Sequence, residues 1–348
     1  MSALIDIRSD TVTRPTAEMR AAMVNAKVGD DVYGDDPTVN DLQAFASDLT
    51  GHEAALFMPS GTQSNLVALL THCNRGDEYI AGSDAHTFKY EGGGAAALGG
   101  IQPQTIEFDS EGGLDLEKVA SVIKKDDVHF ANTRLLCLEN TQHGRVQSLA
   151  RMQQSWTFAH EHQLKIHLDG ARIANACVAL NVSLREMVEG FDSVSICLSK
   201  GLGAPVGSLL LGNRDFIERA RRWRKVTGGG LRQAGVLAAA GKLALTSGLA
   251  RLQEDHDNAR FVADKLKPIP GLSVRNDWTQ TNMVWVDYAR GYGELLSARA
   301  QDAGILMSAY DSHCRIVTHQ DVNQEQLLKV ADLFEQVFNE PVRAVQPA

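Results

Sequence analysis

The feature of this 348-residue chain that most constrains its fold is an alternation, between residues 53 and 212, of short apolar segments with amphipathic helical ones. Helical patterns such as 114–124, 149–162 and 171–180 separate most of the apolar segments. Strands that are apolar on both faces and separated by helices are typical of a mostly parallel sheet covered on both sides. The sequence therefore predicts an α/β fold, with strands expected at 53–58, 78–82, 104–108, 134–140, 165–169, 193–199 and 207–212.

The pattern changes after Gly212. A long helical region follows to about Leu266, broken near residues 227–230, and the rest of the chain is patterned as a smaller α+β unit. The chain is also longer than a typical single domain. We therefore expect an extended N-terminal segment over 1–15, a large α/β domain over 16–250 and a small C-terminal α+β domain over 251–348, the last with strands at 272–276, 282–288 and 314–319 and helices at 291–303 and 323–339.

Charge and composition exclude several classes of partner. The net charge of −9 and the isoelectric point near 5.7 argue against nucleic acid, because phosphate binding needs a basic surface. The basic run 218–225 is for that reason interpreted as an interface or phosphate-side helix. His160, His162 and His167 resemble a metal cluster, but the helical pattern around the first two favours a solvated face, and we expect no metal.

The cysteines and the N-terminal residues indicate the compartment. Five cysteines occur without a CxxC pair, mostly within apolar runs, where reduced and buried thiols are usual. Residues 1–16 lack the basic, apolar and small-residue order of a signal peptide. No apolar run approaches the roughly 20 residues needed to cross a bilayer. We expect a cytoplasmic protein with no membrane partner.

Polar or ionisable residues follow the expected strands at the points where these end. In open parallel sheets, ligands bind at the carboxyl ends of the strands. Because the ends of neighbouring strands meet at one edge, the polar segments should converge there. The sequence therefore predicts an enzyme whose site is built from the segments 59–65, 83–89, 139–144, 169–172 and 199–203.

Lys200 and Asp169 are the most specific pair among these strand ends. A lysine beside small residues at a strand end can be partly removed from water, and its amine is suited to Schiff-base formation. A buried carboxylate at the next strand end can hold a pyridine nitrogen protonated, which is what a pyridoxal phosphate (PLP) ring needs. Taken alone, Lys200 would be interpreted as a surface loop lysine and Asp169 as a helix N-cap. A dinucleotide loop is excluded, because Val206 stands where its third glycine is required.

Two further strand ends supply a phosphate site and a histidine. Gly61 and Thr62 begin an expected helix after Ser60, where free backbone N–H groups and the helix dipole favour an anion. His86 could stack on an aromatic cofactor ring or act as a base. The open alternatives are a plain capped helix for the first segment and a structural histidine for the second.

The assembled pieces resemble the L-threonine aldolase family of PLP-dependent enzymes. The resemblance covers nearly the whole chain and includes the ordered segments 6–16, 28–40, 57–65, 167–172, 199–208, 228–235 and 315–319. It implies an aspartate aminotransferase-like fold (PLP fold type I), with a mostly parallel seven-stranded sheet in the large domain and a small C-terminal α+β domain. It also implies cleavage of L-threonine, L-allo-threonine and related β-hydroxy-α-amino acids to glycine and an aldehyde.

The resemblance also assigns residues to the cofactor. Lys200 would bond covalently to PLP and Asp169 would pair with its ring nitrogen. Gly61 and Thr62 would hold the phosphate, and His86 would stack on the ring. The remaining cofactor contacts implied by the resemblance come from Arg172, Lys225 and Arg232.

For the substrate, the resemblance implies that Ser9, Arg172 and Arg315 grip the α-carboxylate, since an arginine fork suits that group. His86 and His129, directly or through a water, are the candidates for the base that removes the β-hydroxyl proton. Tyr33, together with Lys225 and Arg232, would reach a neighbouring subunit's site, which implies a homotetramer built from dimers.

One departure from the family pattern lies at Gln142 and His143, and it puts the contacts beside Glu139 and Asn140 in question. The alternatives for the activity are another fold type I reaction, namely β-elimination, transamination or racemisation, or a catalytically silent binding protein. Preference at the substrate Cβ stays open, because it depends on sub-ångström placement of side chains.

Overall fold

The computed structural model describes residues 4–339, so the expected domain ends at 1–3 and 340–348 lie outside the described residues. The chain divides into two compact units. The larger unit comprises Pro15–Gln142 and Val146–Leu249. The smaller unit combines the N-terminal residues up to Arg14, the short segment His143–Arg145 and the chain from Ala250 onward.

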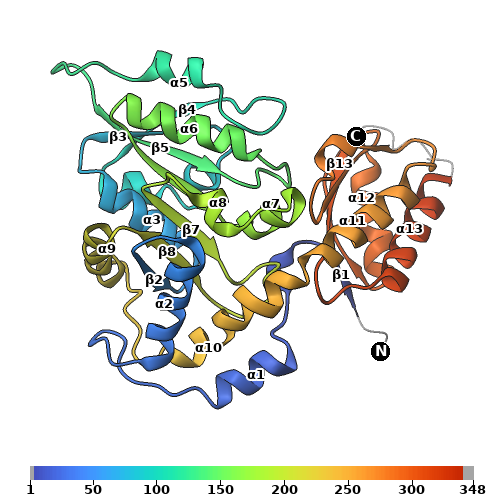
Figure 1. Cartoon of the computed structure of the whole chain (residues 1–348). Coiled ribbons are helices and arrows are strands. Elements are labelled where there is room, and N and C mark those ends of the chain that lie inside the picture. The colour runs from blue at the N-terminus through green and yellow to red at the C-terminus, as the bar shows by residue number, and fades with distance from the viewer. Residues whose placement is uncertain (1–3, 340–348) are drawn as a thin grey trace. The chain divides into compact units, whose positions relative to one another are not determined.

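The larger unit is built on a seven-stranded sheet with the order β2-β8-β7-β6-β5-β3-β4 (Figure 1). Strand β8 runs antiparallel to both of its neighbours, and the other neighbouring pairs are parallel. The predicted mostly parallel seven-stranded α/β sheet is therefore confirmed. The strands are β2 (Ala54–Met58), β3 (Asp77–Gly82), β4 (Gln102–Ile106), β5 (Asn132–Glu139), β6 (Lys165–Gly170), β7 (Ser193–Cys197) and β8 (Ser208–Gly212).

Burial explains why these segments form the centre of the unit. Every residue of β3, β7 and β8 is buried, as expected of strands covered on both faces. Helices lie on both sides of the sheet in Figure 1. The α-helices of this unit are α1 (Ala17–Val24), α2 (Pro37–Thr50), α3 (Gly61–His72), α4 (His86–Lys89), α5 (Leu116–Val122), α6 (Leu149–Glu161), α7 (Ile173–Leu180), α8 (Leu184–Val188), α9 (Arg214–Val226) and α10 (Gly235–Leu243), of which α1 packs on α10.

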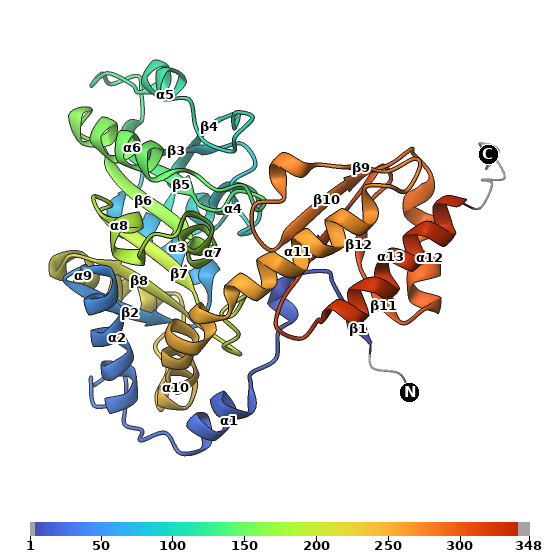
Figure 2. The same ribbon diagram turned by 45° about the vertical axis from the view of Figure 1, so that its right-hand side comes forward.

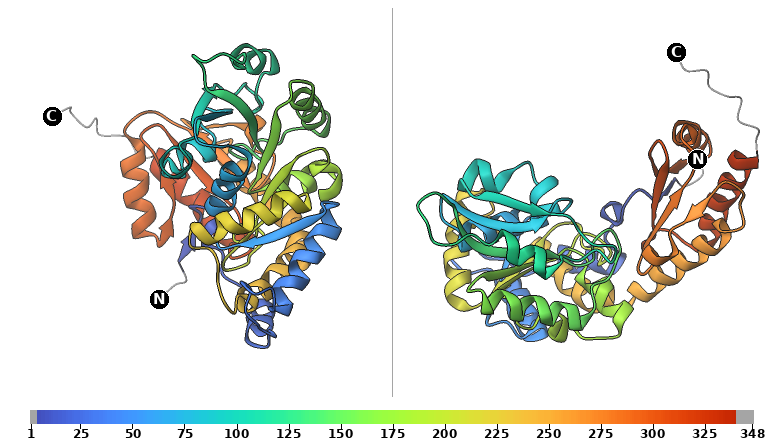
Figure 3. Two further views of the ribbon diagram at one scale, coloured as in Figure 1. Left: turned by 90° about the vertical axis from the view of Figure 1, so that its left-hand side faces the viewer. Right: turned by 90° about the horizontal axis from the view of Figure 1, so that it is seen from above.

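The smaller unit has a four-stranded antiparallel sheet with the order β12-β13-β10-β9. Val284 and Val286 of β10 pack with the helices, whereas Met283 and Trp285 lie in a separate cluster on the opposite face, because strand side chains alternate. The helices accordingly cover one face (Figures 2 and 3). The elements are β9 (Ser273–Val274), β10 (Met283–Asp287), β12 (Ser308–Ala309), β13 (His313–Val317), α11 (Leu252–Leu266), α12 (Tyr292–Asp302) and α13 (Gln324–Asn339).

The N-terminal residues belong to this smaller unit. Strand β1 (Ile5–Asp6) pairs in parallel with β11 (Ile305–Leu306), and a 3-10 turn follows at Asp10–Val12. Ile5 and Ile7 are buried in the same core as the helices of the unit. The segment that was expected to be extended therefore contains a short strand and a turn.

Two expectations from composition can be compared with the described residues. All five cysteines are buried and free of disulfide bonds. No helix within residues 4–339 is long and apolar enough to cross a membrane.

Candidate active site

Asp169 and Lys200 lie at the carboxyl ends of two paired parallel strands. Asp169 is the penultimate residue of β6, and Lys200 follows the end of β7 by three residues. The chain turns immediately after Lys200, whose carbonyl accepts the N–H of Gly203 at 2.8 Å. Gly207 completes the return at a φ of 117°, where a Cβ would lie 2.5 Å from the Phe57 ring. The glycines after Lys200 thus serve a tight turn at the sheet edge.

Asp169 is held in one orientation by two neutral donors. Its Oδ2 accepts a hydrogen bond from Asn65 Nδ2 at 2.9 Å, and its Oδ1 accepts one from the Ala171 N–H at 3.0 Å. The side chain is only 2% exposed. The alternative of a helix N-cap is wrong, because Arg172 occupies the cap position of α7 and makes no side-chain cap bond there. A buried carboxylate with neutral donors is suited to bind a cation.

The N-terminus of α3 faces the same edge. Ser60 caps the helix by accepting the Gln63 N–H at 3.1 Å, and Gly61 and Thr62 are the first two helical residues. N–H groups in the first turn have no partner within the helix, and the helix dipole favours an anion there. A Cβ added at Gly61 would meet its nearest neighbour, Cys197 Sγ, only at 3.9 Å. The backbone at Gly61 is therefore not crowded by neighbouring side chains in that direction.

His86, which follows the end of β3, contacts two carboxyl groups near Asp169. Its Nδ1 donates to Glu91 Oε1 at 2.8 Å, and its backbone N–H donates to Glu139 Oε2 at 2.9 Å. Ligand atoms of His86, Glu91 and Asp169 lie within 4.8 Å of one another. The hydrogen bond to Glu91 raises the pKa of His86, whereas burial raises the pKa of the Glu91 carboxyl.

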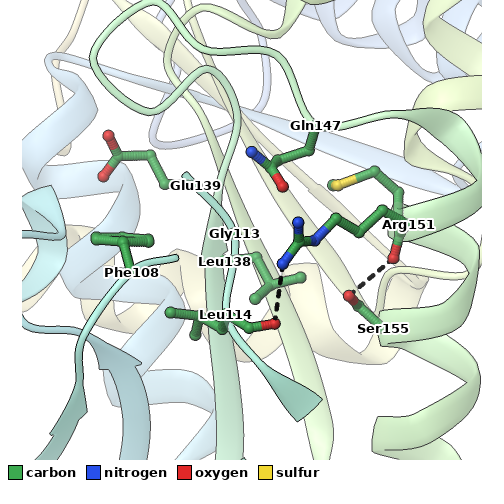
Figure 4. Close-up of a pocket in the computed structure, with 9 residues that line it drawn as sticks. Phe108, Gly113, Leu114, Leu138, Glu139, Gln147, Arg151 and Ser155 are labelled. Atoms are coloured by element: carbon green, nitrogen blue, oxygen red, sulfur yellow. Dashed lines mark hydrogen bonds between the residues drawn. The ribbon is translucent and has the colours of Figure 1, made fainter. Parts of the chain in front are cut away.

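Glu139, at the end of β5, lines a small cavity, about large enough for one water molecule. Figure 4 shows its carboxyl near Phe108, with Gln147 and Arg151 on another wall of the cavity. Burial, and secondly the nearby charge of Asp169, raise the pKa of Glu139 to about 7. The positive charge of Lys200 lowers the pKa of Glu139, so the Lys200 amine is close enough to Glu139 to interact with it electrostatically.

Replacement of Glu139 by glutamine is expected to stabilise the protein increasingly as the pH rises. A carboxyl whose pKa is raised in the folded state contributes its full stability below its ordinary pKa, and that contribution is lost as the pH rises through about 7. Glutamine stays neutral and can still accept the His86 N–H. The free-energy difference between variant and wild type, measured by urea unfolding, should grow between pH 5 and pH 8 by up to about 3 kcal/mol. The exposed Glu335→Gln is the control, and an equal difference at both pH values would contradict the prediction.

The segment that departs from the family pattern keeps defined contacts on its N-terminal side. Asn140 N–H donates to the Asp169 carbonyl at 3.1 Å. The Asn140 side chain exchanges hydrogen bonds at 3.2 Å with the backbone of Gln147. Gln142 is buried in the larger unit, whereas His143 belongs to the smaller unit and contacts Trp285 there.

Arg315 and Ser9 lie in the smaller unit. Arg315 stands opposite Trp285 in the pairing of β13 with β10, with its guanidinium 5.9 Å from the indole ring. Its Nη2 donates to the Arg8 carbonyl at 3.0 Å, so the side chain is fixed beside the N-terminal segment. Ser9 Oγ accepts the Thr11 N–H at 3.2 Å and caps the turn that follows it.

Four other predicted residues lie at the surface of the larger unit. His129 Nδ1 donates to Asp127 at 2.6 Å, and Arg232 pairs with Asp30 at 3.0 Å. Tyr33 is 78% exposed, and Lys225 is exposed at the end of α9. The structure therefore brings Lys200, Asp169, His86 and the start of α3 to one edge of the sheet, whereas the side chains of these four residues contact local partners or solvent.

Three residues of the site were given no role beside Asp169 in the sequence analysis, namely Asn65, Glu91 and His167, although Asn65 ends the predicted segment 59–65. His167 could have been found, because it lies two positions before Asp169 on the same strand and so shares its face. Asn65 and Glu91 gave no comparable signal, since their place beside Asp169 depends on how α3 and the segment after α4 fold back.

An amine, a buried carboxylate and a helix N-terminus at the carboxyl edge of this sheet define a PLP-dependent enzyme of fold type I. The model of the beta-eliminating lyase family matches residues 6–289. The chain is 55% identical to the low specificity L-threonine aldolase of Escherichia coli K12 over 94% of this chain and 97% of that protein. It is 42% identical to low-specificity L-threonine aldolase 1 of Arabidopsis thaliana, over 96% of each chain. The chain belongs to the beta-eliminating lyase family and, within it, to the low-specificity L-threonine aldolases.

Solved structures support the fold independently of close sequence identity. The threonine aldolase of Leishmania major superposes with a TM-score of 0.83 at 18% identity, covering 96% of this chain and 99% of that one. A serine palmitoyltransferase from Sphingomonas wittichii superposes with a TM-score of 0.78 at 19% identity, covering 96% and 87%. The predicted fold class, PLP dependence and family resemblance are thereby confirmed.

Proposed function

We propose that this chain is an aldolase that cleaves L-threonine and L-allo-threonine to glycine and acetaldehyde, and related β-hydroxy-α-amino acids to glycine and the matching aldehyde. The observation that carries the proposal is the placement of Lys200 and Asp169 at the ends of paired strands, in a chain that is 55% identical to a low specificity L-threonine aldolase. The activity would serve threonine breakdown and glycine formation.

The residues at the sheet edge fit the parts of the cofactor. The Lys200 amine is the group that would bond to the PLP aldehyde. Buried Asp169, whose donors from this chain are both neutral, would hold the ring nitrogen, and the N–H groups of Gly61 and Thr62 would hold the phosphate. His86 and Arg172 would flank the ring. The chemistry that PLP supplies when bound is an electron sink for the pair left on the substrate Cα when Cα–Cβ breaks.

We assign removal of the β-hydroxyl proton to His86. Because its Nδ1–H donates to Glu91, the lone pair of the neutral ring is on Nε2, the atom that would accept the proton. The raised pKa of His86 strengthens this nitrogen as a base. His129 remains the second candidate, through a water or directly, and replacing each histidine by asparagine in turn will separate them by the larger loss of kcat.

Arg315 would bind the substrate α-carboxylate, and Ser9 and Arg172 are proposed as further ligands of that group. The carbonyl of Arg8 and the Trp285 ring fix the Arg315 guanidinium, so its N–H groups are already oriented before a carboxylate binds. Such a grip orients the Cα substituents and thereby selects the bond that breaks.

Arg315→Lys is expected to raise KM for L-threonine by roughly 10–100-fold while changing kcat less, because lysine loses the bidentate fork. Steady-state kinetics measure both constants. Arg275→Lys is the matched control, since Arg275 also lies over the Trp285 ring but pairs with Asp287. An unchanged KM for Arg315→Lys would remove Arg315 from the substrate site.

The experiment that tests the function is a coupled assay of acetaldehyde with L-threonine, L-allo-threonine and their D isomers. We expect each L isomer that is cleaved to give one glycine for every acetaldehyde, and we expect both L isomers to be cleaved. Ammonia with a keto acid would indicate β-elimination, a keto acid with aminated cofactor would indicate transamination, and isomerised threonine would indicate racemisation. Any of these in place of acetaldehyde would overturn the proposal. Absence of all products would indicate the catalytically silent alternative.

We further propose a homotetramer of dimers, in which Tyr33, Lys225 and Arg232 reach a neighbouring subunit's site. An exposed apolar group supports an interface in this region, because the segments 28–33 and 226–236 adjoin through the Asp31 N–H and the Arg232 carbonyl. Its exposed members are Val28, Val32, Tyr33, Val226 and Val236. The five unbridged cysteines support a reducing, cytoplasmic location. Light scattering on the purified protein tests the assembly, and a monomer would contradict it.

A further inference from the structure

A row of buried polar side chains leads away from Asp169 between α3 and the sheet. His167 lies two positions before Asp169 on β6 and therefore shares its face, and Ser193 is its register partner on β7. Asn65 and His72 are seven residues apart on α3, about two helical turns, and so lie on one face of that helix, which packs on both strands. Asn65, His167 and Ser193 are almost completely buried.

These side chains form one continuous set of hydrogen bonds. Asn65 Nδ2 lies 2.9 Å from Asp169 Oδ2 and 2.8 Å from Glu91 Oε1. Asn65 Oδ1 lies 3.2 Å from His167 Nε2. Ser193 Oγ lies 2.8 Å from His167 Nδ1 and 2.7 Å from His72 Nε2.

The contacts of the Asn65 amide favour one direction for the hydrogens in this set. The Asn65 amide faces two carboxyl groups, so its NH₂ points to them and its oxygen points to His167. His167 Nε2 must then carry a hydrogen, which it donates to that oxygen. In a neutral ring Nδ1 is bare, so it accepts the hydroxyl hydrogen of Ser193. Ser193 has no second hydrogen, and its oxygen accepts from His72 Nε2.

Both rings are suited to stay neutral. Burial lowers the pKa of His167 to about 4 and that of His72 to about 3. Neither ring therefore carries a proton that it could release near neutral pH. An amide between His167 and Asp169 also interrupts any proton transfer along the row. The set acts by orientation and polarisation rather than as a proton wire.

We propose that His72, Ser193, His167 and Asn65 are positioning residues that fix the orientation of the Asp169 carboxylate toward the cofactor ring nitrogen. Every hydrogen in the row points toward Asp169, so each bond polarises the next in the sense that stabilises its negative charge. The inference rests on the proposed function only in the identity of the group that Asp169 binds.

Ser193 is the residue on which the direction depends. Without its hydroxyl, His167 Nδ1 has no donor, and the ring can place its hydrogen on Nδ1 instead. His167 Nε2 would then oppose the Asn65 oxygen with a lone pair, and the amide would lose its fixed orientation. Other ionisable groups also interact with Asp169 or with the row, and Ser193→Ala leaves all of them in place: Glu91, His86, Glu139, Cys137, Asp192, Lys165 and Arg219.

The first test is the tautomer of His167 in the holoenzyme, from the ¹⁵N resonances of labelled histidine. We expect the hydrogen on Nε2 in the wild type and a shift toward the Nδ1 form in Ser193→Ala. Ser155→Ala is the matched control, because Ser155 is buried but its hydroxyl bonds only to the Arg151 carbonyl of its own helix. A wild-type ring with its hydrogen on Nδ1 would overturn the inference without any variant.

The second test follows the ring nitrogen of ¹⁵N-labelled PLP against pH. In Ser193→Ala and His167→Leu, the midpoint for loss of the ring proton should fall by about one pH unit. This corresponds to a tenfold weaker binding of the proton by the ring nitrogen opposite Asp169. His167→Gln keeps an amide donor toward Asn65 and should recover most of the difference. Wild-type midpoints in both Ser193→Ala and His167→Leu would overturn the inference.

The two proposals fail in different ways. If the wild type binds no PLP, or if its ring nitrogen is unprotonated at neutral pH, the proposed role of Asp169 fails and the inference fails with it. If the wild type has a protonated ring nitrogen and cleaves threonine but the variants titrate as it does, only the positioning row is wrong.

Discussion

Lys200→Ala is expected to abolish both the yellow colour of the purified protein and its turnover of L-threonine. The amine sits at the end of β7, in a turn held by Gly203 and Gly207, and no second described lysine follows a strand of this edge at a comparable position. Because covalent catalysis has no substitute group once the nucleophile is removed, kcat should fall by roughly 10⁴-fold or more. Visible absorbance and the acetaldehyde assay measure the two losses.

Two further variants make the Lys200 result specific. Lys200→Arg keeps the positive charge but not the nucleophilic amine, and it should be as inactive as the alanine variant. Lys242→Ala removes a surface lysine that pairs with Asp41, and it should behave as the wild type. Turnover by Lys200→Ala, or a colourless wild type that binds no PLP, would refute the assignment.

Asp169→Asn is expected to lower kcat on the order of 10³-fold, because it removes a preorganised charge without changing the shape of the side chain. The amide oxygen can still accept the Ala171 N–H, so the fold around β6 should persist. Cofactor should remain bound through Lys200, while the ring nitrogen loses its proton at neutral pH. Steady-state kinetics and the ¹⁵N resonance of labelled PLP report the two effects.

Asp192→Asn is the control for Asp169→Asn, because it removes a second carboxylate that lies beside the same strands. Asp192 accepts the Ile166 N–H at 2.9 Å and pairs with Lys165, away from the carboxyl edge of the sheet. Its replacement should cost stability but leave kcat within a few-fold. A similar loss of kcat in both variants would indicate that the effect of Asp169→Asn comes from the fold rather than from the ring nitrogen.

Helix α3 connects the two ends of the site. Its first residues, Gly61 and Thr62, face the position assigned to the phosphate, and Asn65 one turn later binds Asp169. His72, its last residue, stacks on Phe216 at a ring-centroid distance of 4.5 Å. One helix therefore carries both the N–H groups proposed to hold the phosphate and the amide that orients Asp169.

Periodicity was sufficient to predict the strands of the main sheet, because burial on both faces requires continuous apolar runs such as those of β7 and β8. It did not predict the antiparallel direction of β8, since a two-sided buried strand has the same composition in either direction. The short strands β1, β11 and β12 were also missed. A strand of two residues carries no periodicity. β1 forms only because β11, about 300 positions away, supplies its hydrogen bonds, whereas β12 pairs with β13 a few residues later.

The sequence by itself determined which residue types stand at the strand ends, namely Lys200 and Asp169 after two paired strands and Gly61 and Thr62 at the start of α3. These follow from chain order, because each residue is a few positions from a strand that the pattern reveals. Only the tertiary structure decided which polar groups surround Asp169. Asn65 and Asp169 are 104 positions apart, and His167 and Ser193 are 26 apart. Hydrogen bonds between such residues depend on how strands and helices pack, which no local pattern encodes.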